Sequence, residues 1–437
     1  MTAWRNWSGL ETAFPSRVEQ PDGVAAVVGA VERARADRST VKMAGSGHSF
    51  TAIAAPEAAL LTPQRLSGIV AVDRDAMTVT ALAGTPLKVL NAGLEGLGLS
   101  LHNMGDIAEQ TLAGAISTGT HGTGGVTAGL SAQVAGLELV TGTGEVLRAT
   151  PRENPDVLDL ARLGLGSLGI LTTVTFRVEP LFLLAAHEQP MSWDEALGSF
   201  NELASDSHHL DLYWFPHTDR MLLKRNDRLD ADLSEAEPLP RWRGWLDDDF
   251  LANTVFGAAC TAANQVPAVI PRLNGVLARA LTARSYSDVA HRVFTSRRDV
   301  VFREMEYAVP REAGLPALWE ARRAIEAADW RIGFPVEVRV APADDVPLST
   351  AFGRDTMYLA FHTHHRSDWR DHAAYFTAME AIMRAHDGRP HWGKLHTRTA
   401  ADLASAYPRF GDFLAMRDRL DPDRVFANAH LRRILGD

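Results

Sequence analysis

Two loops rich in small residues have the composition best suited to binding a phosphate-bearing ligand. The first, Gly45-Ser46-Gly47-His48-Ser49-Phe50, follows a short apolar run that predicts a strand over residues 41–44. Closely spaced glycines let backbone N–H groups approach a phosphate, although a structural turn is the simpler alternative. The loop lacks the third glycine and the downstream acid of a dinucleotide fingerprint, which disfavours NAD binding in that mode.

The second loop, LAGAISTGTHGTGG at residues 112–125, consists almost entirely of small residues. Small side chains let a large planar ligand lie against the backbone, and Ser and Thr hydroxyls with backbone N–H groups can hold phosphates. A glycine-rich surface loop without a ligand is the alternative.

A charged pair alternates with valines further along the chain. Glu337 and Arg339 lie between Val336, Val338 and Val340, so on a strand the two charged groups share one face and the valines the other. A carboxylate beside a guanidinium can both accept and donate hydrogen bonds to a polar ligand. The alternative is an ordinary cross-strand ion pair.

Histidines and a lysine near the C-terminal end could move protons or stabilise charge. His362 and His364 share a strand face, and a near-neutral imidazole suits proton removal from a hydroxyl. No acidic or cysteine partner stands at ligand spacing, so we predict no metal site. Lys394 can stabilise a developing negative charge, and His396 shares its face if the segment is extended. A solvated surface lysine is the alternative.

The elements around these residues predict an α+β fold, because strands and hairpins alternate irregularly with helices. A helix should begin at Asp22, with an apolar stripe of Val24, Val27, Val28 and Val31. Further strands are expected over 69–73, 77–82, 137–141, 145–149, 169–178, 335–341 and 356–363, and helices over 85–95, 154–163, 244–295, 312–329 and 369–385. We predict a cofactor domain over residues 1–179, a substrate domain over 180–386, and a segment 387–437 that returns to the first domain.

Composition narrows the function classes. The chain has 437 residues, 46% of them hydrophobic, and a formal charge of −10, which argues against a nucleic-acid partner. A single cysteine, Cys260, excludes an internal disulfide or a cysteine-rich metal site, and its neighbours predict a packed helix face. There is no signal-peptide pattern, and the most apolar stretch, 256–283, is too polar to span a membrane, so a cytoplasmic protein is expected.

Taken together, these motifs resemble the vanillyl-alcohol-oxidase superfamily of FAD enzymes. The resemblance rests on GSGHSF (45–50), AGAISTGTHGTG (113–124), FPVEVR (334–339), HWGK (391–394) and DPDRVFAN (421–428), and it spans nearly the whole chain. Within the superfamily the chain is similar to the branch of aldonolactone oxidases and dehydrogenases and alditol oxidases. The resemblance implies a two-domain FAD-binding fold whose substrate domain mixes sheet and helix.

The resemblance also implies residue roles toward FAD. His48 would tether the flavin covalently through its 8α-methyl carbon, and Lys394 would stabilise negative charge on the reduced ring. Gly105 occupies a position where a small residue admits oxygen, and Asp106 stands where polyol oxidases have serine. The remaining predicted FAD contacts are Gly45, Ser46, Gly47 and Ser49 at the pyrophosphate, Gly114, Ser117, Thr118, Gly119, His121 and Gly122 along the groove, and Ile170 near the adenosine.

The function implied by the resemblance is oxidation of a hydroxyl group on a sugar 1,4-lactone, ranked above oxidation of an alditol or of a sugar-containing metabolite. Glu337, Arg339 and His362 would hold the substrate, and the base remains open between His362, Lys394 and a water. O2, giving hydrogen peroxide, or another acceptor would reoxidise the flavin. The rivals are a nicotinamide dehydrogenase, which lacks its fingerprint here, and a non-catalytic flavin-binding module, which would not need Lys394 or the Glu337–Arg339 pair.

Overall fold

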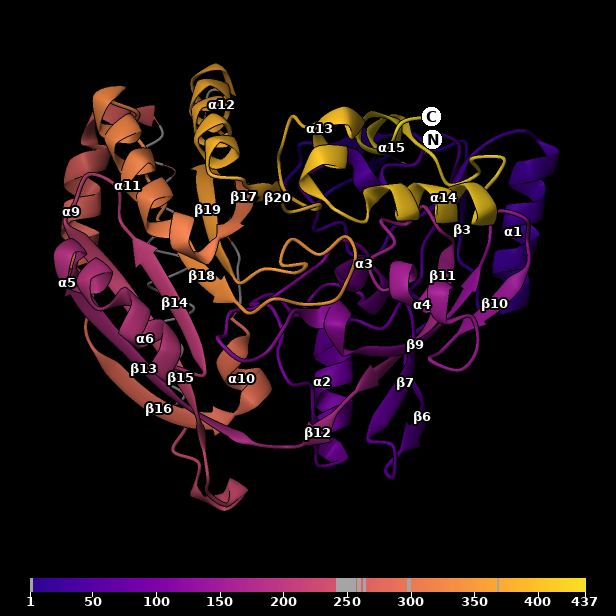
Figure 1. Ribbon diagram of the computed structural model, residues 1–437, viewed down its shortest axis with the longest axis horizontal. Coiled ribbons are helices and arrows are strands. Elements are labelled where there is room, and N and C mark those ends of the chain that lie inside the picture. The colour runs from indigo at the N-terminus through magenta and orange to yellow at the C-terminus, as the bar shows by residue number, and fades with distance from the viewer. Residues whose placement is uncertain (1–2, 241–256, 258–260, 262–264, 297–299, 368) are drawn as a thin grey trace.

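The computed structural model describes residues 3–240, 257, 261, 265–296, 300–367 and 369–437. Its largest sheet is antiparallel and has eight strands (Figure 1). The strand order is β16-β13-β15-β14-β18-β19-β17-β20. The strands are β13 (Leu183–Ser192), β14 (His209–Trp214), β15 (Arg220–Leu229), β16 (Arg284–Val289), β17 (Phe302–Pro310), β18 (Val336–Ala341), β19 (Thr356–His364) and β20 (Arg389–Pro390). Segments far apart in sequence therefore contribute to one surface.

Alternation along the strands gives this sheet one apolar and one polar face. In β18, Val336, Val338 and Val340 are buried in the core, whereas Glu337 and Arg339 point to the other side, as predicted. Helices α5 (Trp193–Gly198), α6 (Phe200–Asp206), α11 (Arg311–Ala327) and α12 (Trp369–Ala385) cover the apolar face (Figure 1). The largest buried side chains of this core are Trp193, Trp214, Tyr307, Tyr375, Phe200 and Phe361.

The second half of the molecule is built on a five-stranded antiparallel sheet in the order β10-β9-β11-β7-β6. Its strands are β6 (Ile69–Asp73), β7 (Thr78–Leu82), β9 (Val134–Val140), β10 (Val146–Ala149) and β11 (Ile170–Arg177). Helices α2 (Leu87–Gly96), α3 (Leu112–Ser117) and α4 (Pro155–Ala161) pack apolar side chains into one core with this five-stranded sheet. This half holds both glycine loops, and the loop after α3 contacts the polar face of the large sheet.

A smaller parallel sheet, β3 (Arg17–Glu19), β5 (Ala59–Leu61) and β4 (Val41–Met43), packs with α1 (Val24–Ala36). The predicted stripe on α1 is confirmed, because Val27 and Val31 are fully buried there. Two strand pairs complete the sheets, β1 (Trp4–Arg5) with β2 (Thr12–Ala13) and β8 (Leu99–Ser100) with β12 (Glu179–Pro180).

The last segment of the chain returns from the large sheet to the half that contains the five-stranded sheet. After β20 it forms α13 (Ala400–Ala406), α14 (Phe410–Leu420) and α15 (Ala429–Leu435). Asn428 ties it down, because its side-chain amide donates hydrogen bonds to the carbonyls of Ala52, Ile53 and Ala55. One apolar core holds residues of 53–178 and 392–435 with Val346 and Leu348, a second lies within 191–383, and a smaller one surrounds α1. The domain boundaries themselves stay a prediction.

The α+β class is confirmed, but two local predictions are wrong. Residues 244–256, 258–260 and 262–264 of the helical stretch expected over 244–295 lie outside the described residues. In the rest, strand β16 interrupts the helical pattern between α9 (Ile270–Ala280) and α10 (Ala290–Phe294), because β16 pairs with the edge of β13. The stretch 112–125 is not all loop: it begins as α3, whose N-cap Thr111 accepts a hydrogen bond from the backbone N–H of Gly114. Cys260 lies outside the described residues. Among the described helices, none combines the length and apolarity needed to cross a lipid bilayer.

Candidate active site

A cavity of about 880 Å³, including the open space at its mouth, lies between the two glycine loops. That volume is in the range of small-molecule and cofactor sites. Nine of the predicted FAD contacts line it: Gly45, Ser46, Gly47, His48, Ser49, Gly114, Ser117, Thr118 and Ile170. Gln110, Thr111, Leu165, Gly166 and Phe426 also line it.

Two positions lining this cavity require glycine. A Cβ on Gly45 would lie 2.2 Å from the hydroxyl oxygen of Thr111, and Gly47 has a φ of +69°, which favours glycine. The loop 45–49 therefore presents bare backbone to the cavity, as a phosphate cradle requires. This donor set fits the diphosphate of FAD.

His48 enters the cavity from the first loop with its ring stacked on Trp7, at 5.5 Å between ring centroids and 27° between planes. Its Nδ1 atom is buried, and within the described part of the chain it has no hydrogen-bond partner. Burial lowers the pKa of His48, Glu109 opposes that shift and Lys394 adds to it, so the ring is neutral at pH 7. A neutral imidazole nitrogen without a partner suits covalent attachment to a ligand in this cavity.

Lys42 is a cavity residue that sequence reasoning missed. It is buried on β4, and its Nζ donates to the carbonyl oxygens of Gly166 at 2.9 Å and Phe426 at 3.0 Å. Burial lowers the pKa of Lys42 to about 7, although Asp421 and Glu57 oppose the shift. The side chain joins three segments at one wall of the cavity.

On the polar face of the large sheet, the predicted Glu337–Arg339 pair belongs to a larger set. The Arg339 guanidinium lies 2.5 Å from Glu337 Oε1 and 3.0 Å from Asp211 Oδ1, and Tyr213 donates a hydrogen bond to Glu337 at 2.8 Å. Burial raises the pKa of Asp211 to about 6, with Glu337 adding to the shift and Arg339 opposing it. These groups offer both donors and acceptors to a polyhydroxylated ligand.

Lys394 and His362 meet at Glu304, two strands further along the same face. The ammonium of Lys394 donates to the Glu304 carboxylate, and His362 Nε2 lies 3.6 Å from Glu304 Oε1. His362 Nδ1 lies 3.0 Å from the carbonyl oxygen of Pro335, which can only accept, so Nδ1 carries the hydrogen. Burial would raise the pKa of Glu304, but Lys394 and His362 together lower it to about 2.

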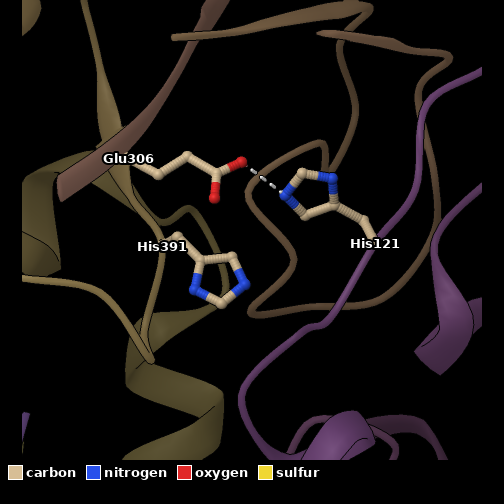
Figure 2. A group of neighbouring side chains, drawn as sticks. All are labelled: His121, Glu306 and His391. Atoms are coloured by element: carbon tan, nitrogen blue, oxygen red, sulfur yellow. Dashed lines mark ion pairs between the residues drawn. The ribbon is translucent and has the colours of Figure 1, made fainter. Parts of the chain in front are cut away.

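His121, Glu306 and His391 form a buried cluster where the second glycine loop meets β17 (Figure 2). His121 Nε2 lies 2.8 Å from the Glu306 carboxylate, and its Nδ1 lies 2.8 Å from the Gly122 carbonyl oxygen. Burial opposes ionisation of Glu306, yet His121 and Lys394 bring its pKa well below the usual range. Because both neighbours of the His121 ring accept hydrogen bonds, both ring nitrogens carry hydrogen and the ring is an imidazolium.

The same three side chains are close enough to consider a metal ion, with ligand atoms within 4.8 Å of one another. The hydrogen bonds oppose that interpretation. His391 Nδ1 accepts from the Gly393 backbone N–H at 3.0 Å, so the hydrogen of its neutral ring sits on Nε2. Burial lowers the pKa of His391 to about 3, which keeps the ring neutral. The cluster is suited to hydrogen bonding rather than to a cation.

The other predicted residues lie elsewhere. His396 packs against His430 of α15, at 6.1 Å between ring centroids, in a loop and not on a strand beside Lys394. Asp106 accepts a hydrogen bond from the Ser296 hydroxyl at 2.5 Å, and a Cβ on Gly105 would lie 3.1 Å from the His121 carbonyl oxygen. Gly119 and Gly122 pack against Leu163 and Met104, outside the lining of the cavity.

Sequence reasoning missed six residues of the site: Lys42, Asp211, Tyr213, Glu304, Glu306 and His391. A usable signal existed for four of them. Glu304 and Glu306 alternate with buried Met305 and Tyr307, and Asp211 and Tyr213 alternate with buried leucines, in the pattern that identified Glu337 and Arg339. The other two, Lys42 on a strand of only three residues and His391 in a loop, give no such signal.

Known proteins are similar to this chain over nearly its whole length. The family model described as D-arabinono-1,4-lactone oxidase matches residues 174–434, and the one described as FAD binding domain matches residues 15–150. An L-gulono-1,4-lactone dehydrogenase of Mycobacterium tuberculosis is 38% identical, with 99% of each chain covered. The L-gulonolactone oxidase of Mus musculus is 30% identical, covering 99% of this chain and 98% of that protein. Cholesterol oxidase from Brevibacterium sterolicum shares the fold, with a TM-score of 0.82 at 19% identity, covering 99% of this chain and 96% of the other.

The substitution Glu306→Gln tests the buried pair. Removing one partner of a buried ion pair leaves the other charge uncompensated and costs about 3–5 kcal/mol. We expect the free energy of unfolding, measured by urea titration of the FAD-loaded protein, to fall by about 3 kcal/mol. Glu320→Gln is the matched control, because the Glu320–His386 pair is half-exposed, and it should cost less than about 1 kcal/mol. Equal losses in the two variants would contradict the role of Glu306.

Lys42 should make stability depend on pH. Its pKa is about 7 in the folded protein and about 10.4 in the unfolded chain, so the unfolded state binds more protons between these values. Stability relative to Lys42→Met should therefore rise by about 2 kcal/mol from pH 7 to pH 9, and be lost again as the pH falls toward 7. Urea titrations at both pH values measure this difference. Exposed Lys88→Met should show no such change, and a pH-independent difference for Lys42→Met would refute the assignment.

Proposed function

The chain belongs to the D-arabinono-1,4-lactone oxidase family of FAD-dependent oxidoreductases, and from that membership we propose that it oxidises a hydroxyl group of a sugar 1,4-lactone. The resemblance to the vanillyl-alcohol-oxidase superfamily is confirmed, and so is FAD as the cofactor. The observation that carries the proposal further is the meeting of Lys394, His362 and Glu304 beside the Glu337–Arg339 pair on one sheet face.

FAD, when bound, supplies the acceptor for the hydride that leaves the substrate carbon. The residues of the cavity between the glycine loops would hold its diphosphate and adenosine parts. We propose that His48 forms a covalent bond with the flavin, supported by its neutral ring and its unpartnered Nδ1.

The polar face of the sheet would act on the lactone. Glu337 and Arg339, fixed by Asp211 and Tyr213, accept and donate hydrogen bonds to substrate hydroxyls. His362 is the base that we favour, because Pro335 holds the hydrogen on Nδ1, and a hydroxyl proton taken up by Nε2 would be stabilised by the Glu304 carboxylate 3.6 Å away. Lys394 keeps a fixed positive charge beside the reacting groups.

The electron acceptor after each turnover is proposed as O2 or another oxidant. Gly105 leaves room that a Cβ would restrict, since that Cβ would lie 3.1 Å from both the His121 carbonyl oxygen and Thr120 Cγ2. A small residue at this place is compatible with access of O2, with hydrogen peroxide as the product.

Denaturation tests the covalent bond. Acid precipitation followed by washing should leave the yellow flavin with wild-type protein and with His187→Ala, an exposed histidine of β13. The His48→Ala pellet should lose it, and intact mass should fall by one FAD. Flavin that washes out of the wild-type protein would show that His48 makes only a non-covalent contact.

Turnover with a substrate panel tests the reaction itself. We expect kcat/KM to be higher for L-gulono-1,4-lactone or D-arabinono-1,4-lactone than for alditols, with peroxide and dye reduction followed in parallel. Lys394→Met should lower kcat by about 10²–10³, the usual loss when one charge-stabilising donor is removed, while Lys88→Met should not. Preference for alditols would reject the lactone assignment, and retained turnover in Lys394→Met would reject the site.

A further inference from the structure

Glu304 is a buried carboxylate whose part in the reaction is still unassigned. It lies on β17, is 5% exposed, and its carboxylate accepts a hydrogen bond from the Lys394 ammonium. Its backbone carbonyl also accepts a hydrogen bond from the Leu395 N–H at 2.9 Å. One residue therefore binds Lys394 through its side chain and the following residue through its backbone.

No second carboxylate is equally available to Lys394 among the described residues. Glu306 Oε2 lies 3.8 Å from Lys394 Nζ, but Glu306 is already paired with the His121 imidazolium at 2.8 Å. On another side, Lys394 Nζ lies 5.1 Å from the centre of the Phe50 ring. Glu304 is thus the counter-charge of Lys394.

These four side chains, Glu304, Glu306, Lys394 and His121, form what we call the charge cluster. It contains two carboxylates and two cations, so its formal charges cancel. The adjoining His391 ring is neutral and adds no charge. In a buried site each remaining charge acts over several ångströms, because little solvent screens it.

We propose that Glu304 is a positioning residue that limits, through Lys394, how strongly the site favours reduced over oxidised FAD. This inference rests on the proposed function, in which Lys394 stabilises the negative charge of the reduced flavin. A site with Lys394 uncompensated would hold electrons more tightly and release them more slowly to the acceptor. Glu304 keeps the ammonium in place while cancelling its net charge.

The experiment measures the flavin midpoint potential by reductive titration, which needs no sugar substrate. Glu304→Gln keeps the shape and an acceptor oxygen but removes the charge. At the wild-type midpoint potential, this variant should raise the ratio of reduced to oxidised flavin about tenfold. That ratio corresponds to a rise in the midpoint potential of about 30 mV for a two-electron couple. Lys394→Met should shift the potential in the opposite direction. The double variant, in which the formal charges again cancel, should return close to wild type.

The matched control is Glu188→Gln. Glu188 is a buried carboxylate on the same sheet face, paired with Arg284 at 2.8 Å. Four strands lie between its strand and that of Glu304, so five inter-strand spacings separate them, a distance of roughly 24 Å. Its removal should leave the potential unchanged.

The outcomes separate this inference from the proposed function. An unchanged potential in Glu304→Gln would show a structural role only, and a lowered potential would show that misplacement of Lys394 dominates; either result overturns the proposal. A double variant that stays as far from wild type as a single variant would overturn it as well. If no lactone or alditol is oxidised, the proposed function fails, while the potentials still decide the role of Glu304.

Discussion

The ion pair between His121 and Glu306 is the contact on which the arrangement of the site depends. Two charged groups can remain buried at a junction only when each satisfies the other, so this pair fixes how the second glycine loop meets the large sheet. Neighbouring contacts reinforce it: His121 stacks on Tyr358 at 3.7 Å, and Gly124 donates a backbone hydrogen bond to Val340. The half that holds both glycine loops and the large sheet consequently have one relative placement.

Features with a local cause were readable from the amino-acid sequence. Strand alternation placed Glu337 and Arg339 on one face, and the two glycine loops line one cavity because only bare backbone fits there. Contacts between distant segments were not readable. Lys42 is held by carbonyls of Gly166 and Phe426, and Glu304 finds Lys394 ninety residues away. Strand β16 was taken for helix because its pairing with β13, not its local pattern, decides its conformation.

The charge cluster and the Asp211–Arg339–Glu337 set both stabilise ionised groups at buried positions. Each keeps ionised groups out of water by surrounding them with opposite charge. Glu304 and Glu306 occupy alternate positions of β17, as Glu337 and Arg339 do on β18, whereas Lys394 and His121 come from loops. Because the carboxylates of both sets are held by the sheet, they need little reorganisation when charge moves during a reaction. That property agrees with the FAD-dependent oxidoreductase family to which the chain belongs.

The two-sidedness of the large sheet also has a consequence for protein engineering. Along β14, β17, β18 and β19, odd and even positions belong to different environments, one packed under helices and one facing the cofactor half. A mutant library confined to the polar-face positions would vary the side chains that face the other half of the molecule and leave the apolar side chains packed under the helices unchanged. In a library that randomises consecutive positions, most variants would carry changes in the apolar core and would not fold.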